Sequence, residues 1–184
     1  MNVAHRLFQK EGFDGTGVGR VSSEAGIAPN TLYWYFEDKD ALLIAVLDRL
    51  VNDAVREYAK VQAEPLQHRV QWLFERFDSA AGLIVTVHAR VSASTALREW
   101  HDRFHRMLEV MVIQLLADLG LSEGDRALAA RVGTFVVEGL LSHREGGREE
   151  RDAILRFVTS LLARAYANPV QSASSGARER PPAR

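Results

Sequence analysis

The stretch from residue 16 to residue 42 constrains the fold of this chain more than any other. Its apolar residues recur at the spacing that two short helices need when they pack across a tight turn: Val18, Val21, Ala25, Ile27, Leu32 and Phe36. Gly26 follows Ala25 and can take the left-handed conformation that ends the first helix. Pro29 suits the first turn of the second helix, where its missing N–H is not needed. The stretch therefore predicts a helix-turn-helix.

The second helix of this motif, predicted over residues 29–34, has an outer face that suits the major groove of DNA. Amide, hydroxyl and aromatic groups on that face can contact base edges, phosphates and thymine methyl groups. The outward residues are Asn30, Thr31, Tyr33 and Trp34.

The first helix of the motif offers further contacts to DNA. Thr16 is a suitable N-cap for that helix, and its hydroxyl together with the N–H groups of Gly17 and Val18 would form an anion site. A cap with no further role is the alternative for Thr16. Arg20 lies on the polar face of the helix, where it either reaches DNA or faces solvent.

These residues, with the helix predicted before them, resemble the DNA-binding motif of the TetR family of bacterial transcriptional regulators. The family pattern is an apolar helix ending in Gly-aromatic, a Thr, an Ala-Gly-apolar turn, a Leu-Tyr-x-aromatic-Phe segment and a Lys shortly after it. The matching residues are Leu7, Phe8, Gly12, Phe13, Thr16, Ala25, Gly26, Ile27, Thr31, Leu32, Tyr33, Tyr35, Phe36, Lys39 and Leu42. The resemblance covers about the first quarter of the chain.

The resemblance implies functional features that the residues alone do not establish. Tyr35 and Lys39 join the predicted DNA-binding residues, with Lys39 contacting a phosphate group. A homodimer would bind the two half-sites of a palindromic double-stranded DNA operator. An unknown small-molecule effector in the C-terminal part would relieve repression. Family members usually carry further helical turns with basic residues before the position of Met1, so a truncated N-terminus is expected.

The charge of the chain does not by itself indicate DNA binding. The formal net charge of the 184 residues is −1, and residues 1–42 hold four Lys and Arg against six Asp and Glu, which gives −2. This balance argues against strong non-specific affinity for DNA. It keeps open a second interpretation, a helical dimer that has lost DNA binding, although helix N-termini and a few cations can still hold phosphates.

Two absences narrow the class of protein. The sequence has no cysteine, which excludes disulfides and thiolate metal sites and is compatible with a reducing cytoplasm. Its longest apolar run, residues 41–47, is too short to span a bilayer. We therefore expect a cytoplasmic protein without a membrane partner.

The remaining sequence predicts helices up to residue 168. Amphipathic patterns indicate helices over about 38–64, 66–77, 95–119 and 122–143, and a last helix that ends at 168. Residues 80–94 fit a helix or, locally, a strand, because Gly82 and a β-branched run weaken the helical pattern. The predicted fold class is all-α with about nine helices: a DNA-binding domain over residues 1–40, an effector-binding and dimerisation domain over 41–168, and a disordered tail over 169–184.

The last two predicted helices carry more apolar surface than one small domain can easily bury. We predict that they form the homodimer interface as a four-helix bundle, in which Gly139 lets the partner helices approach closely. The predicted interface residues are Leu128, Val132, Phe135, Val136, Gly139, Leu140, Leu155, Val158, Leu162 and Tyr166.

Aromatic, sulfur and polar side chains of the C-terminal helices are candidates for an effector pocket. The predicted lining residues are Trp72, Phe77, His88, Trp100, Phe104, Met107, Met111, Phe135 and Glu138, with His101 and His143 as further polar candidates. Ordinary core packing accounts for most apolar stripes of this kind. The pocket itself is implied by the family resemblance rather than by periodicity.

A metal-dependent or cofactor-dependent helical enzyme is the competing class. His101 and His105 have the i, i+4 spacing that can bind zinc on one helix face. However, Asp102 replaces the Glu of the zinc protease motif, and the sequence shows no third ligand at a defined spacing. The chain also lacks a Gly-x-Ser-x-Gly nucleophile motif and a complete Gly-rich phosphate loop. We therefore predict no enzyme, no cofactor and no metal site.

Overall fold

The computed structural model describes residues 1–142 and 147–167. Within these ranges the chain forms nine α-helices, one short 3-10 helix and no strand, which confirms the all-α prediction. The helices are α1 (Asn2–Gly15), α2 (Val18–Ala25), α3 (Pro29–Tyr35), α4 (Lys39–Tyr58), α5 (Leu66–Asp78), α6 (Ala81–Arg90), α7 (Thr95–Leu115), η1 (Ala117–Leu119), α8 (Glu123–Ser142) and α9 (Gly147–Ala167). His143 and the predicted disordered tail lie outside the described residues. None of the described helices is apolar over a length that would cross a membrane.

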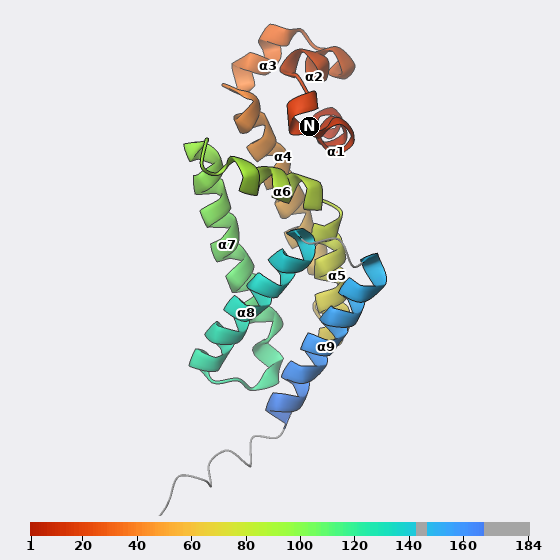
Figure 1. Cartoon of the computed structure of the whole chain (residues 1–184), viewed down its shortest axis with the longest axis vertical. Helices are drawn as coiled ribbons and strands as arrows, with labels where there is room; N and C mark the ends of the chain where they lie inside the picture. The colour runs from red at the N-terminus through yellow and green to blue at the C-terminus, as the bar shows by residue number, and fades with distance from the viewer. Residues whose placement is uncertain (143–146, 168–184) are drawn as a thin grey trace, which may run out of the picture.

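The three N-terminal helices lie together at one end of the molecule, and α4 leads from them into the remaining helices (Figure 1). Helix α6 crosses between the two parts, where it contacts α1 on one side and α7 and α8 on the other. In the C-terminal part, the most extensive helix contact is between α7 and α8, and α9 packs against α5. Helices α4 and α6 therefore both contact α1 and the C-terminal helices.

The turn between α2 and α3 forms as the sequence predicts. Gly26 has φ 68° and ψ 28°, and its N–H donates to the carbonyls of Ser22 and Ser23, which ends α2. Pro29 begins α3, and Leu32 is its buried contact with the core. The helical conformation of α1 is interrupted at Gly12, at φ 74° and ψ 172°, where the Gly-aromatic pattern places the end of the first helix, and a short helical segment follows to Gly15.

One continuous cluster of buried side chains runs from α1 to α9. Leu7 of α1, Leu43 of α4, Leu83 of α6 and Leu97 of α7 are among its fully buried members. Each is an apolar side chain removed from water, which is the main favourable contribution to folding. The N-terminal helices therefore share a core with the C-terminal helices.

Residues 81–90 are helical, so the local strand alternative is excluded. Leu83, Ile84 and Val87 are buried, which is the spacing of one helix face rather than the alternation of a strand. The β-branched residues tolerate the helix because burial against α1, α7 and α8 outweighs their small intrinsic preference for strands.

Candidate functional site

The predicted DNA-contacting side chains of α3 share one exposed surface. Asn30, Thr31, Tyr33, Trp34 and Tyr35 are all exposed, and Trp34 reaches 84% exposure. Three neighbouring aromatic side chains on a seven-residue helix leave an unusual amount of apolar surface in water. A partner molecule that covers this surface would remove it from water.

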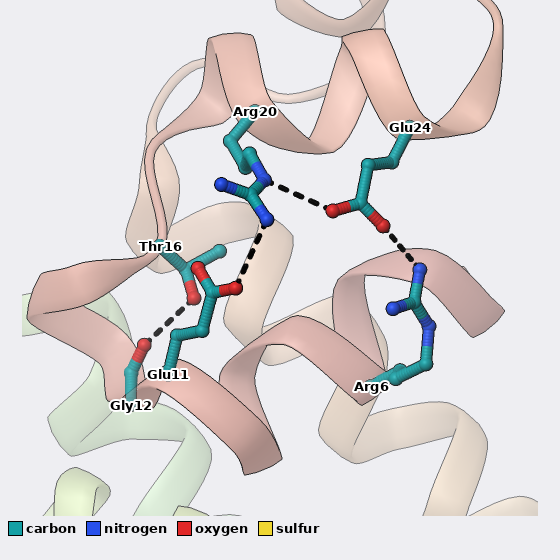
Figure 2. A network of polar contacts seen from close by, with 6 residues as sticks. All are labelled: Arg6, Glu11, Gly12, Thr16, Arg20 and Glu24. Carbon is teal, nitrogen blue, oxygen red and sulfur yellow. Dashed lines mark hydrogen bonds and ion pairs between the residues drawn. The ribbon is translucent and has the colours of Figure 1, made fainter.

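Thr16 does not cap α2, contrary to the prediction from the sequence. Its side chain is fully buried, and its Oγ1 donates a hydrogen bond of 2.7 Å to the carbonyl of Gly12 (Figure 2). The N-cap of α2 is Gly17, and Thr16 instead closes the end of α1. The prediction that the Thr16 hydroxyl helps to hold an anion is therefore wrong, because that hydroxyl is already bonded within the protein. Gly17 remains exposed at the start of α2.

Arg20 lies in a network of ion pairs between α1 and α2 (Figure 2). Its Nη2 is 3.2 Å from Oε1 of Glu11 and its Nε is 2.9 Å from Oε1 of Glu24, which also pairs with Arg6. Hydrogen bonds from Arg6 and Arg20 lower the pKa of Glu24, and the bond to Glu24 raises the pKa of Arg20. The structure thus accounts for Arg20 as a link between two helices, and its contact with DNA stays a prediction.

Lys39, predicted to contact a phosphate, bonds to the end of α1. Its Nζ donates a hydrogen bond of 2.8 Å to the carbonyl of Phe13 and lies 4.2 Å from the centroid of the Phe13 ring. A cation in the first turn of α4 is unfavourable with respect to the helix dipole, and these two contacts offset that cost. Asp38 caps the same helix by accepting from the N–H of Ala41.

Arg90 at the end of α6 is a functional candidate that sequence reasoning missed. Its guanidinium carbon lies 4.3 Å from the centroid of the Phe13 ring, and its Nε and Nη2 donate to the two carboxylate oxygens of Asp40 at 3.1 and 3.2 Å. Arg90 and Asp40 are 50 residues apart in sequence, so no local pattern indicates the pair. Through Arg90, α6 is attached to both α1 and α4.

Four of the predicted pocket residues line two adjacent spaces beside α4. Phe77, Trp100 and Phe104 border an apolar space of about 20 Å³ between α4, α5, α6 and α7. Trp100 and Phe104, with Met107, also border a wider groove of about 240 Å³ between α4 and α7. The indole N–H of Trp100 donates to Asp48 at 2.7 Å, which places a polar group at that groove.

The other predicted pocket residues lie elsewhere. Trp72 packs against Tyr58, with ring centroids 5.9 Å apart, and Met111 packs on the main core. Phe135 is 64% exposed on α8, so its assignment to the pocket is wrong. His88 and Glu138 do not border the two spaces beside α4.

His88 and Glu138 instead meet the predicted histidine pair at the junction of α6, α7 and α8. The ring centroids of His101 and His105 are 4.1 Å apart, and His88 lies 5.0 Å from His101 and 6.4 Å from His105. Glu138 Oε1 is 2.6 Å from Nε2 of His105 and 3.8 Å from Nε2 of His88. The sequence shows no third ligand at a defined spacing because the two further candidate ligands come from distant positions in the chain.

Burial shifts the pKa of three side chains in this cluster. Desolvation lowers the pKa of His88 and of His105, and the neighbouring imidazole of His101 lowers both further. Desolvation also raises the pKa of Glu138, against the effect of the nearby histidines. All four side chains keep a partly exposed edge.

The predicted dimer residues divide between two faces of α8 and α9. Leu128, Val132 and Phe135 are exposed on α8. Leu140 and Leu155 are buried within the protomer, and Val136, Val158 and Leu162 border an internal apolar space with Leu155. The interface prediction is therefore wrong for Leu140 and Leu155, which have almost no exposed surface to offer a partner subunit.

The exposed apolar residues of α9 are ones that the prediction did not include. Ile154, Phe157 and Leu161 are exposed, and Phe157 reaches 68%. A side chain at Gly139 would point into open space within the protomer. The side chain of Tyr166 is outside the part that the structure describes. We call Leu128, Val132, Phe135, Ile154, Phe157 and Leu161 the α8/α9 apolar surface.

Comparison with known proteins assigns the family. Residues 1–46 match the model for bacterial regulatory proteins of the tetR family. An HTH-type transcriptional regulator of Staphylococcus aureus (strain MRSA252) is 32% identical over 153 residues, which cover 74% of this chain and 79% of that protein. The chain belongs to the TetR family. Other S. aureus regulators align with this TetR protein over 60 residues, so the chain covers about a third of their length.

Solved structures share the TetR fold over nearly the whole chain. A transcriptional regulator from Rhodococcus sp. Rha1 superposes with a TM-score of 0.70 at 15% identity, over 90% of this chain and 92% of that one. FadR from Bacillus subtilis, solved in complex with stearoyl-CoA, has a TM-score of 0.63 at 16% identity. The match covers 88% of this chain and 95% of that one. The TetR family and these relatives are transcriptional regulators rather than enzymes, and this chain is a DNA-binding regulator of that family.

Proposed function

We propose that this TetR regulator represses transcription by binding a palindromic operator as a homodimer, and that a small-molecule effector releases it. The observation that carries the proposal is the exposed surface of α3, with five polar and aromatic side chains facing solvent. A seven-residue helix can insert only its N-terminal part into a major groove. Asn30 and Thr31 would then contact base edges, while the residues that follow position the protein on the backbone.

Phosphate contacts would surround that base contact. Gly17 at the start of α2, the aromatic hydroxyls of Tyr33 and Tyr35, and the amino group of Lys39 are the candidates, with Trp34 packing against sugar or methyl groups. Arg20 already pairs through Nε and Nη2 with Glu24 and Glu11, and these carboxylates offset its charge, so we expect it to contribute less than Lys39.

The α8/α9 apolar surface supports the homodimer. Its residues follow one another at i, i+4, i+7 on α8 and at i, i+3, i+7 on α9, so each helix presents one outward stripe. Exposed apolar side chains of this kind are common in protein interfaces. A twofold axis beside α8 and α9 would form a four-helix bundle and bring two α3 helices to one DNA.

The small apolar space beside α4 supports an effector with an apolar body. At about 20 Å³ it holds little more than one water molecule, so an effector would have to move its walls apart. Two of these walls are α4 and α6, which carry Lys39, Asp40 and Arg90. Lys39 and Arg90 contact Phe13 near the end of α1, and Asp40 binds Arg90. Parting α4 from α6 would therefore shift the DNA-binding helices.

A DNA-binding titration tests the proposal. The chain is titrated against a labelled duplex of the DNA upstream of its own gene and against a shuffled duplex of the same composition. We expect the upstream duplex to bind at least about 10³-fold more tightly, as specific sites do. Equal binding of both duplexes would contradict a specific operator in this DNA. No binding of either would support the helical dimer without DNA binding that the −2 charge of residues 1–42 keeps open.

A further inference from the structure

We propose that His88, His101, His105 and Glu138 bind one divalent transition-metal ion, with Zn²⁺ as the first candidate. The four residues come from three helices, α6, α7 and α8, and they are the group of potential metal ligands found among the described residues. The proposal concerns metal binding alone and does not depend on how the chain binds DNA.

The geometry of the cluster fits a single ion. One donor atom from each of the four residues lies within 4.8 Å of every other. Ligand atoms around a tetrahedral Zn²⁺ with bonds of about 2.1 Å are about 3.4 Å apart. The widest pair therefore needs to approach by about 1.4 Å, which rotation of partly exposed imidazoles can supply. His101 and His105 already face one another from successive turns of α7.

Two of the possible metal-ligand atoms are buried and form no hydrogen bond. Nε2 of His105 and Oε1 of Glu138 are inaccessible to solvent, and neither forms a hydrogen bond with a described residue. They lie 2.6 Å apart, yet the carboxylate oxygen is not in the direction in which the ring nitrogen would donate. Buried polar atoms nearly always have a partner, and a cation coordinated by both atoms would supply one for each. The two atoms would then have to move apart from their present 2.6 Å.

The donor types decide which metal the site prefers. Three imidazole nitrogens and one carboxylate oxygen suit Zn²⁺, Ni²⁺ or Co²⁺, whereas Mg²⁺ and Ca²⁺ prefer oxygen ligands. The absence of cysteine from the sequence removes the thiolate ligands that would favour Cu(I).

Metal binding would connect α6 to α7 and α8. His88 lies two residues before Arg90, which contacts Phe13 and Asp40 in the N-terminal part. An ion held jointly by His88, the α7 histidines and Glu138 would fix α6 against α7 and α8. We therefore expect the ion to stabilise the fold as well as to bind.

The test uses the full chain without a histidine tag, stripped of metal with a chelator and titrated with Zn²⁺ against a chromophoric competitor. We expect one tight equivalent of Zn²⁺ for the unmutated chain, and a rise in its melting temperature when Zn²⁺ is added. His105→Ala and Glu138→Gln should weaken this binding by more than about tenfold, because even residues that only orient metal ligands contribute about 10- to 100-fold.

His68→Ala is the matched control. His68 is an exposed histidine whose Nδ1 is 3.4 Å from Glu64, so it pairs with a carboxylate outside the cluster. The control should keep the tight equivalent. Glu138→Gln preserves side-chain size and decides the result if an alanine variant fails to fold. Absence of a tight equivalent and of a melting shift in the unmutated chain, or equal loss in the control, would overturn the proposal.

Discussion

The guanidinium carbon of Arg90 lies 4.3 Å from the centroid of the Phe13 ring, and Lys39 lies 4.2 Å from the same centroid. The ring at the end of α1 therefore contacts one cation from α6 and one from α4. Since Arg90 also binds Asp40 through two hydrogen bonds, the end of the first helix is held by both helices that border the apolar space. This contact is the physical basis of the proposed response to an effector.

Replacing Arg90 should destabilise the fold measurably. Arg90→Ala leaves the largely buried carboxylate of Asp40 without its bidentate partner, and we expect the free energy of unfolding to fall by about 1–3 kcal/mol. Urea denaturation measures the change. Arg56→Ala is the control, because Arg56 forms an exposed pair with Asp53 that should contribute about 0.5 kcal/mol or less. Equal losses in the two variants would show that the Arg90–Asp40 contact stabilises the fold no more than an exposed ion pair does.

Lys39→Ala should weaken binding to all DNA sequences about equally. If Lys39 contacts a phosphate, its removal lowers the slope of log affinity against log salt by about one unit. Lys60→Ala, at an exposed position beyond the end of α4, is the control and should leave the slope unchanged. A stability loss without a change of slope would assign Lys39 only to its bond with the Phe13 carbonyl.

Asn30→Ala should change sequence preference rather than the salt dependence. A base-edge contact by the Asn30 amide contributes roughly 1–3 kcal/mol at the cognate site. We expect the variant to lose preference at one or two base positions in a binding-site selection. An unaltered selection profile would show that Asn30 does not contact a base.

Phe157→Glu should separate the protomers. A charge at this exposed position of α9 opposes burial of the α8/α9 apolar surface, so sedimentation should show a monomer with unchanged helix content. Val55→Glu, at an exposed apolar position on α4, is the matched control and should stay a dimer. A dimer that survives Phe157→Glu, or a monomer before mutation, would refute the interface. Val158→Glu is a poorer test, because Val158 borders an internal apolar space and its charge should destabilise the fold.

Local patterns predicted the fold and the DNA-binding motif well. The left-handed Gly26, the start of α3 at Pro29 and the buried Leu32 each depend on neighbours a few residues away. The prediction for Thr16 failed by a single residue, because Gly17 caps α2 and Thr16 closes α1.

Contacts between distant segments could not be predicted from such patterns. The approach of His88 and Glu138 to the α7 histidines, like that of Arg90 to Asp40, follows from how α6 crosses the molecule. The faces of α8 and α9 were confused for a related reason. Successive residues of a helix differ by about 100° in direction, so Phe157 and Val158 point to different neighbours although both are apolar.

The most direct test of the regulator account is selection of bound sequences from random duplex DNA by the unmutated chain. A dimer that places one α3 helix in each of two half-sites should enrich a twofold-symmetric sequence, with half-site centres roughly 10 base pairs or a multiple of that apart. When the selected duplex is titrated into the protein, two protomers should bind each site. A selection that enriches no sequence, or that yields an asymmetric site bound by one protomer, would contradict the account.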